Sequence, residues 1–215
     1  MKATIIFTQA KGGSGKTTLL TQLAAHWLDA GLSVALVDLD PQGSSLAWAH
    51  LRETAARPAQ LKLALESADW RAASDLREAQ AAADLVLVDT AGHAEALRGL
   101  IRDRADLMVI PVQPSMADVL ATQATLKTAA AGTTPHFLVL NRCPPRSRAA
   151  DAARAQLAQT GAPMAETRLG QRAAYAEAFM MGAGVTELPT ARRAAQEIRA
   201  LAGEIAAHLS RSRDI

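Results

Sequence analysis

The chain has 215 residues, of which 49% are hydrophobic but only 3% are aromatic, and its formal net charge is +2. This length suits one α/β domain with a core of Leu, Val, Ile and Ala, and no apolar stretch approaches the roughly 20 residues of a membrane span. Cys143 is the only cysteine and the chain enters its first strand without a signal peptide, so we expect a cytoplasmic protein without an intrachain disulfide.

The first motif lies between an apolar run at residues 3–7 and a helical pattern at residues 19–28. The segment between them, residues 9–18, reads Gln-Ala-Lys-Gly-Gly-Ser-Gly-Lys-Thr-Thr. A buried strand, a glycine-rich loop, a Gly-Lys-Thr sequence and a helix make up the arrangement that cradles phosphate groups. Glycines let backbone N–H groups approach phosphate oxygens closely, and the helix N-terminus adds a positive partial charge.

This loop therefore predicts a nucleotide site with a magnesium ion. The ammonium group of Lys16 is expected between the outer phosphates, and the hydroxyl group of Thr17 is expected to ligate Mg²⁺. The predicted nucleotide-binding residues of the loop are Lys11, Gly12, Gly13, Ser14, Gly15, Lys16, Thr17 and Thr18.

The loop departs from the general P-loop pattern at two positions. Ala10 stands where that pattern has its first glycine, and a second lysine, Lys11, directly precedes the glycine pair. In this form the segment resembles the deviant Walker A motif, Lys-Gly-Gly-x-Gly-Lys-Thr-Thr, of the ParA/MinD class of P-loop ATPases. The resemblance implies ATP and Mg²⁺ as cofactors and a homodimer bridged by ATP. It also implies a catalytic role for Lys16, and for Lys11 at the nucleotide of the partner subunit.

The second predicted strand brings two acids to the same region. Residues 32–37 are apolar and lead into Asp-Leu-Asp-Pro-Gln at residues 38–42. Open α/β sheets place their chemistry at the carboxyl ends of parallel strands. The segment resembles the Asp-x-Asp-Pro-Gln element of the same class, and by that resemblance Asp40 helps to position the attacking water while Asp38 supports the magnesium shell. The plainer alternative for Asp40 is a turn or helix-capping residue.

A further buried strand, residues 85–88, delivers Asp89 to its carboxyl end. Asp-Thr-Ala-Gly at residues 89–92 is typical of a Walker B strand joined to a switch loop, in which the acid can hold Mg²⁺ and the glycine backbone can sense the γ-phosphate. The alternative is a core strand that ends in a capping Asp.

Residues 45–82, between these two strands, carry no chemistry that the sequence identifies. We expect helices at residues 45–53 and 70–82 and an edge strand at residues 61–65 in this region.

Helices and strands continue to alternate over residues 93–141. The pattern predicts a helix at residues 93–104, a strand at residues 106–113, a helix at residues 116–131 capped by Ser115, and a strand at residues 136–140. Asn141 follows this last strand. In the resembling class an Asn at this place reads the adenine, so Asn141 is the candidate for base recognition.

The C-terminal third is predicted to extend the same architecture. We expect a helix at residues 149–160, a short strand at residues 163–166, a helix within residues 170–178 and a last helix at residues 191–209. Alternation of strands and helices, with no internal repeat or linker, predicts a single domain over residues 1–215. Its fold class is α/β, with a doubly wound, mostly parallel sheet flanked by helices, as in P-loop NTPases.

Basic residues concentrate in the C-terminal third. Residues 141–215 hold 11 arginines against 7 acidic residues, whereas residues 1–140 have a slight acidic excess. This asymmetry predicts an anionic partner, although a solvated arginine-rich surface would show the same pattern. ParA-type partition ATPases bind nonspecific DNA through arginines late in the chain, and the resemblance gives Arg146 and Arg172 as DNA-binding candidates. The patch could extend to Arg192, Arg193 and Arg199, for which an ordinary surface position is the alternative.

Together these patterns favour a slow, partner-stimulated ATPase of the ParA type that binds nonspecific DNA as an ATP dimer. It would segregate or position plasmid or chromosomal DNA on the nucleoid, with a ParB-like centromere-binding or adaptor protein as its partner. The alternatives are positioning of a protein cargo, such as a carboxysome or a chemoreceptor cluster, and a nucleotide-gated scaffold in conjugative DNA transfer. A membrane role is disfavoured because residues 196–210 are mostly Ala with a few Leu and Ile, follow the fold without a break and lack aromatics, unlike a MinD-type membrane helix. An iron–sulfur carrier of related fold is also disfavoured, because such carriers need a pair of cysteines at the dimer interface and the chain has only Cys143.

Overall fold

Six strands form one sheet in the order β3-β2-β4-β1-β5-β6, and every neighbouring pair is parallel. The computed structural model of the chain describes residues 2–68, 70–91, 104–130 and 132–213. Strand β1 lies between β4 and β5, so the chain builds the sheet outward in both directions from β1, and the crevice for a ligand lies at its carboxyl end. The strands span Ala3–Phe7 (β1), Val34–Leu39 (β2), Leu63–Glu66 (β3), Leu85–Thr90 (β4), Leu107–Val112 (β5) and His136–Leu140 (β6).

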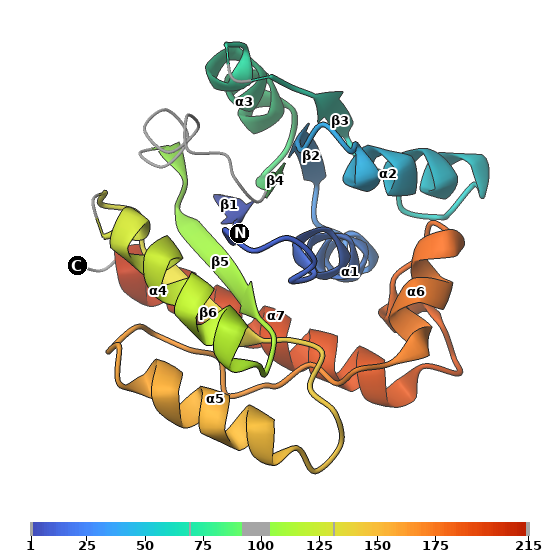
Figure 1. Cartoon of the computed structure of the whole chain (residues 1–215). Coiled ribbons are helices and arrows are strands. Elements are labelled where there is room, and N and C mark those ends of the chain that lie inside the picture. The colour runs from blue at the N-terminus through green and yellow to red at the C-terminus, as the bar shows by residue number, and fades with distance from the viewer. Residues whose placement is uncertain (1, 69, 92–103, 131, 214–215) are drawn as a thin grey trace.

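Helices cover both faces of this sheet (Figure 1). One face carries α1, α2, α6, α7 and a short 3₁₀ helix, η3, and the other carries α3, α4 and α5. The doubly wound α/β fold predicted from the sequence is therefore confirmed. The helices span Lys16–Asp29 (α1), Ser44–Thr54 (α2), Ala72–Ala82 (α3), Met116–Ala129 (α4), Arg148–Ala158 (α5), Ala173–Met180 (α6), Val185–Glu187 (η3) and Arg192–Arg213 (α7).

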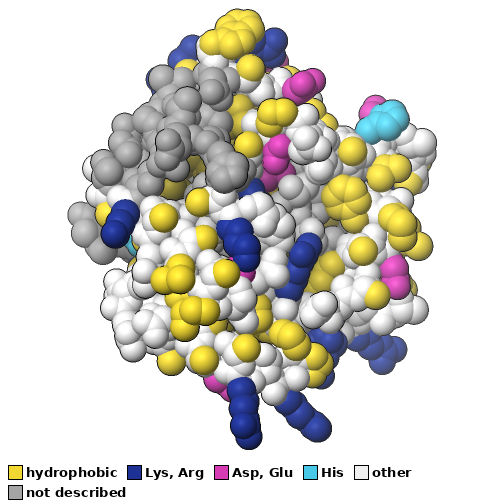
Figure 2. All heavy atoms as spheres, viewed as in Figure 1, with side chains coloured by type: hydrophobic (Ala, Val, Ile, Leu, Met, Phe, Trp, Pro, Cys, Tyr) yellow, Lys and Arg dark blue, Asp and Glu magenta, His cyan; other side chains and the backbone are white. Residues whose placement is uncertain are grey.

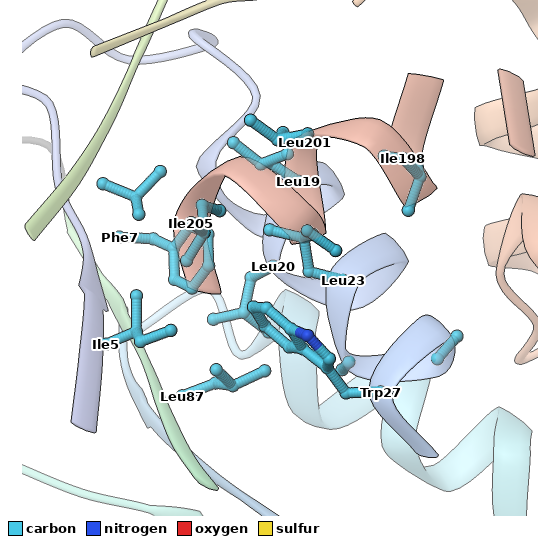
Figure 3. Close-up of a cluster of buried hydrophobic side chains, with 14 of the residues drawn as sticks. Ile5, Phe7, Leu19, Leu20, Leu23, Trp27, Leu87, Ile198, Leu201 and Ile205 are labelled. Carbon is cyan, nitrogen blue, oxygen red and sulfur yellow. The ribbon is translucent and has the colours of Figure 1, made fainter. Parts of the chain in front are cut away.

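Alternate residues of β1 point into different cores. Ile5 and Phe7 contribute to the core under α1 and α7, whereas Ile6 joins the core under α3 on the other face. Figure 3 shows leucines of α1 and apolar residues of α7 gathered around the side chains of β1: Leu19, Leu20, Leu23, Ile198, Leu201 and Ile205. The last helix is thus an integral layer of the main core. In the part of the chain that the structure describes, no helix is long and apolar enough to cross a membrane.

The predicted elements differ from the observed ones at a few places. The strand predicted at residues 163–166 is wrong, because this segment touches β6 only at an isolated bridge between Met164 and Leu138. After Ala165, whose N–H still donates to the Leu138 carbonyl oxygen, the backbone bonds to α7 instead, because the Glu166 and Thr167 N–H groups donate to the Glu204 carboxylate. Helix α7 runs to Arg213, beyond its predicted end. The helix predicted at residues 93–104, apart from its last residue, and the switch-loop residue 92 lie outside the described residues.

Candidate functional site

A glycine allows the loop between β1 and α1 to approach the end of β6 closely. Gly15 precedes the first residue of α1 with φ of 92°, and a Cβ atom there would come within 2.4 Å of the Asn141 Nδ2 atom. Any other residue at this position would be strained by the backbone angle and would displace Asn141. The loop therefore needs glycine where it approaches the end of β6.

Side chains from β5 and α4 fix the first half of this loop. Gln9 is fully buried and donates hydrogen bonds from Nε2 to the Pro111 carbonyl oxygen and to Thr122 Oγ1. Thr125 Oγ1 donates to Gln9 Oε1 and accepts from the Ala10 backbone N–H. Because both threonines lie on α4, the start of the loop and this helix form one polar unit.

The second half of the loop is fixed by residues that follow β5 and β6. The Gly13 carbonyl oxygen accepts hydrogen bonds from Gln113 Nε2 at 2.6 Å and from an Arg142 guanidinium nitrogen at 3.1 Å. Asn141 Nδ2 donates to the Ser14 carbonyl oxygen at 2.9 Å, and its Oδ1 accepts from the Arg142 N–H. With these carbonyl oxygens engaged outward, the loop can direct its N–H groups inward.

Two buried polar groups of the loop fit an absent anion. The hydroxyl oxygen of Ser14 is buried and has no hydrogen-bond partner in the part of the chain that the structure describes. Lys16 is only 7% exposed, and within the described residues no carboxylate lies within ion-pairing distance of its ammonium group. Buried polar groups are normally paired, and a buried cation beside a helix N-terminus is matched best by an anion. A phosphate chain satisfies both requirements.

Thr17 and Asp89 form the other wall of the same crevice. The Thr17 hydroxyl donates to Asp89 Oδ2 at 2.6 Å, and Asp89 Oδ1 accepts from the Thr90 N–H. Burial, together with the negative charges of Asp38 and Asp40, raises the pKa of Asp89 to about 7, although the Thr17 hydrogen bond and the positive charge of Lys16 act to lower it. A carboxyl group with this environment gains from a cation, which is what a Mg²⁺ site next to a phosphate chain requires.

The other two acids of this edge make hydrogen bonds of their own. Asp38 is buried, and its Oδ2 accepts from the Ser45 N–H, the Ser45 hydroxyl and the Leu46 N–H, so it caps the start of α2 from the neighbouring strand. Its Oδ1 accepts from the Asp40 N–H, while Asp40 Oδ1 accepts from the Gln42 N–H in a turn. The magnesium role of Asp38 and the catalytic role of Asp40 stay predictions. No group of three or more His, Cys, Asp or Glu side chains arranged to hold a metal occurs among residues 2–68, 70–91, 104–130 and 132–213.

An open hollow of about 510 Å³ adjoins the loop. Its lining includes Thr17, Thr18, Asn141, Arg142, Tyr175 and Phe179. The hollow offers apolar surface and two amide or guanidinium groups next to the loop, as a nucleoside would need. Asn141 therefore lies where the sequence places it, although base recognition itself stays a prediction. Arg142 was missed by the sequence, and only its tertiary contact with Gly13 reveals it.

The Lys11 side chain forms an ion pair within its own chain. Its Nζ atom lies 2.5 Å from Asp118 Oδ2 in the first turn of α4, and its side chain is 41% exposed. The sequence predicts different roles for Lys11 and Lys16, and their environments differ, because Lys16 is buried whereas Lys11 lies at the surface. Asp118 was not singled out by the sequence, because an acid in the first turn of a helix is commonplace.

The predicted DNA-binding arginines do not form one cluster. Arg146, Arg172 and Arg193 line a hollow of about 240 Å³ together with Glu197 and Asp151. Figure 2 shows basic side chains protruding near this edge, over α5 and the loop before it. Arg192 and Arg199 do not line this hollow.

Within this hollow Arg172 and Arg146 differ in their exposure and in their hydrogen bonds. The guanidinium group of Arg172 donates to both carboxylate oxygens of Glu197, at 3.1 and 2.5 Å, and is only partly exposed. Arg146 is exposed, and its backbone has φ of 53°. The DNA role of all five arginines stays a prediction, and at Arg172 a phosphate would have to compete with Glu197.

Comparison with known proteins supports the geometric reading. A family model described as the CobQ/CobB/MinD/ParA nucleotide binding domain matches residues 5–185. The maintenance of carboxysome distribution protein A of Halothiobacillus neapolitanus is 33% identical over 209 residues, covering 94% of this chain and 95% of that protein. Protein ParA of Rhizobium radiobacter is 25% identical over 186 residues, covering 83% and 82%. An ATP complex of a Cyanothece McdA variant matches with a TM-score of 0.72 at 16% identity, covering all of this chain and 97% of that one.

Proposed function

Because the chain belongs to the CobQ/CobB/MinD/ParA family of nucleotide-binding domains, we propose that it is an ATPase switch that dimerises around ATP and positions a cargo over DNA. The observation that carries this proposal is the loop itself. In one crevice lie the Thr17–Asp89 pair, a buried Lys16 that forms no ion pair within the described residues, and a Ser14 hydroxyl that finds no hydrogen-bond partner among them, with a second lysine at the rim.

Each residue of the crevice has a proposed task. The backbone of residues 12–18 and the Lys16 ammonium group would hold the phosphates, and Asn141 would contact the adenine. Thr17 and Asp89 would hold Mg²⁺, with Asp38 supporting them through its position beside Asp89 in the sheet. When bound, the metal neutralises charge that develops on the phosphate oxygens.

Hydrolysis would depend on residues at the rim of the crevice. Asp40 is half-buried in a turn at the end of β2, where its carboxylate can orient water. Lys16 would stabilise charge within its own subunit, and Lys11 would do so in the partner subunit. Since one of these cations arrives only with the dimer, we expect slow hydrolysis that an adaptor protein stimulates.

The cargo is proposed from the relatives. A protein named for carboxysome distribution shares a third of its residues with this chain over nearly the whole length of both, whereas the ParA relative is 25% identical over a shorter stretch. This difference favours a large protein assembly as cargo. Segregation of plasmid or chromosomal DNA is the second candidate, supported by the ParA relative. Loss of an otherwise stable plasmid after deletion of the gene would favour the second candidate, and clustering of a protein assembly would favour the first.

The surface over which the cargo moves is proposed to be nonspecific DNA of the nucleoid. The excess of arginine after residue 140 and the exposed Arg146 support this proposal. Such contacts to phosphates carry no sequence information, so binding should weaken steeply with salt. A ParB-like adaptor protein would complete the system.

Replacement of Lys11 tests the proposed dimer. We expect wild-type protein to double its mass in ATP and Mg²⁺ by light scattering, and Lys11→Ala to stay monomeric while it still binds nucleotide. Lys62→Ala, which removes an exposed lysine at the edge of the sheet, is the matched control and should dimerise like the wild type. A Lys11→Ala protein that dimerises normally would contradict the trans role of this lysine.

A further inference from the structure

The pair formed by Lys11 and Asp118 has a consequence for the switch. We propose that Asp118 is a positioning residue that holds Lys11 in cis in the monomer and thereby sets how readily the ATP dimer forms. This inference rests on the proposed function, because it concerns the lysine that would cross to the partner subunit. The relevant observation is the 2.5 Å contact between Lys11 Nζ and Asp118 Oδ2.

Asp118 pairs with Lys11 and does not serve only to cap the start of α4. Ser115 and Asp118 stand in the positions of a capping box, in which the serine hydroxyl accepts from the backbone N–H three residues on. That bond is present, at 3.1 Å. The reciprocal bond, in which the Ser115 N–H would donate to the acid, is replaced by a bond from this N–H to the Gln113 carbonyl oxygen. The carboxylate is thus diverted from the cap to Lys11.

Lys11 is the cation that compensates this carboxylate. Asp118 is 1% exposed, and its Oδ1 atom is buried with no hydrogen-bond partner among the described residues. Its Oδ2 atom accepts from the Ser115 hydroxyl and from the Lys11 ammonium group. No other ion pair of Asp118 is formed within the described residues. A buried carboxylate that loses its paired cation is destabilising, so the departure of Lys11 opposes dimer formation.

The loop connects this pair to the nucleotide. Gln9 and Ala10, directly before Lys11, bond to Thr122 and Thr125 one and two turns after Asp118 on α4. These bonds keep the loop backbone in place while the Lys11 side chain, which is 41% exposed, is free to rotate outward. Only the side chain therefore has to move between the two partners, the carboxylate of its own chain and the nucleotide of the other.

Asp118→Asn tests this role, with Asp75→Asn as its matched control. Asp75 is also a buried carboxylate in the first turn of a helix and is paired with Arg71, but it lies on α3 and does not contact the loop. At saturating ATP and Mg²⁺, sedimentation velocity should give a dimer dissociation constant about three- to tenfold lower for Asp118→Asn than for wild type. The nucleotide affinity of the monomer should be unchanged, and Asp75→Asn should leave the dimer constant as it is.

A second measurement reads the cis pair without a dimer. In nucleotide-free monomer, the rate at which an amine-acylating reagent modifies Lys11, followed by mass spectrometry, should rise severalfold in Asp118→Asn and stay constant in Asp75→Asn. If Asp118→Asn does not fold, Ser115→Ala replaces it. Loss of the hydroxyl leaves the carboxylate more dependent on Lys11, so the dimer dissociation constant should rise instead of fall.

The outcomes separate the two proposals. Wild-type protein that stays monomeric in ATP and Mg²⁺ contradicts the proposed dimer itself, before any variant is compared. A wild-type dimer whose constant is the same in Asp118→Asn and Asp75→Asn, with equal labelling of Lys11, overturns only the role of Asp118. A weaker dimer in Asp118→Asn also overturns it, because the carboxylate would then assist the crossing of Lys11.

Discussion

At the scale of single residues, Asp89 has the pKa that its surroundings change most clearly within the site. In the metal-free protein its pKa is raised to about 7 from 3.8, chiefly by burial. Between these pH values the folded state holds a proton that the unfolded state has released. The free energy of unfolding therefore falls as the pH rises from 4 to 7, by up to about 4 kcal/mol, and bound Mg²⁺ would offset this loss above pH 7.

Asp89→Asn should remove this dependence. Without nucleotide and Mg²⁺, the melting temperature of the variant relative to that of wild type should rise between about pH 4 and pH 7 and level off above that range. Asp84→Asn, at the exposed amino end of β4, is the control and should follow the wild-type profile. Thermal unfolding at four pH values gives the answer, and parallel curves for wild type and Asp89→Asn would show that Asp89 does not titrate in this range.

The sequence predicts such residues when their signal is local. The glycine-rich loop, Asp89 at the end of a buried strand and Ser115 before α4 are all recognised from their neighbours in the chain, and the structure places them as expected. Arg142 and Asp118 carry no such signal. Their partners, Gly13 and Lys11, are more than 100 residues away, so only the folded sheet brings them to the loop.

At the scale of elements, the hollow between the β6–α5 loop and α7 combines cations with acids. Arg172 there is already neutralised by Glu197, which also accepts from the Gly170 N–H. Arg172 holds the pKa of Glu197 below its usual range, against burial, which favours the protonated form. The pair therefore ties the segment before α6 to α7. Arg146, by contrast, is exposed at the mouth of the same hollow.

This contrast predicts different effects of the two arginines on DNA binding. In ATP and Mg²⁺, Arg146→Ala should weaken binding to any duplex roughly three- to tenfold and make the dependence on salt shallower by about one phosphate contact per subunit. Arg172→Ala should chiefly lower the melting temperature. Arg77→Ala, an exposed arginine on α3, serves as the control. Binding isotherms at several salt concentrations decide, and equal slopes for Arg146→Ala and wild type would exclude Arg146 from the interface.

At the scale of the whole molecule, one buried arginine joins distant parts of the chain. Arg52 is fully buried in α2 and pairs with Glu187 of η3 through two hydrogen bonds of 3.0 and 2.9 Å. It also donates to the carbonyl oxygens of Ala59 and Gly182 and lies over the Trp48 ring. This cluster fixes α2, which follows the acids of β2, against the segment before α7.

Arg52→Ala should lower the free energy of unfolding by about 3–5 kcal/mol, because it leaves Glu187 and two carbonyl oxygens without their partner. Arg57→Ala is the matched control. The half-buried Arg57 uses its guanidinium group, within the described residues, only for bonds to the Met181 carbonyl oxygen, and its loss should cost less than about 1 kcal/mol. Urea unfolding measures both changes. Equal losses in the two variants would contradict the structural role of Arg52.

The fold as a whole was largely predictable, since the apolar runs of the buried strands and the spacing of the helices follow directly from the sequence. What the sequence could not supply is pairing across the molecule. Arg52 reads as an ordinary helix residue and Arg172 as a free cation, and the bonds by which Asp38 caps α2 could not be foreseen. Each of these differences arises because a charged side chain finds its partner on another element.

The bonds that hold the phosphate loop from outside also show that it is not a portable cassette. Its turn depends on Thr125, Gln113 and Asn141, which come from three different places in the chain. Residues 9–18, placed alone between a strand and a helix of another protein, would lack these hydrogen bonds. Engineers who wish to move this motif would have to carry over the ends of β5 and β6 and the first turns of α4 as a single scaffold.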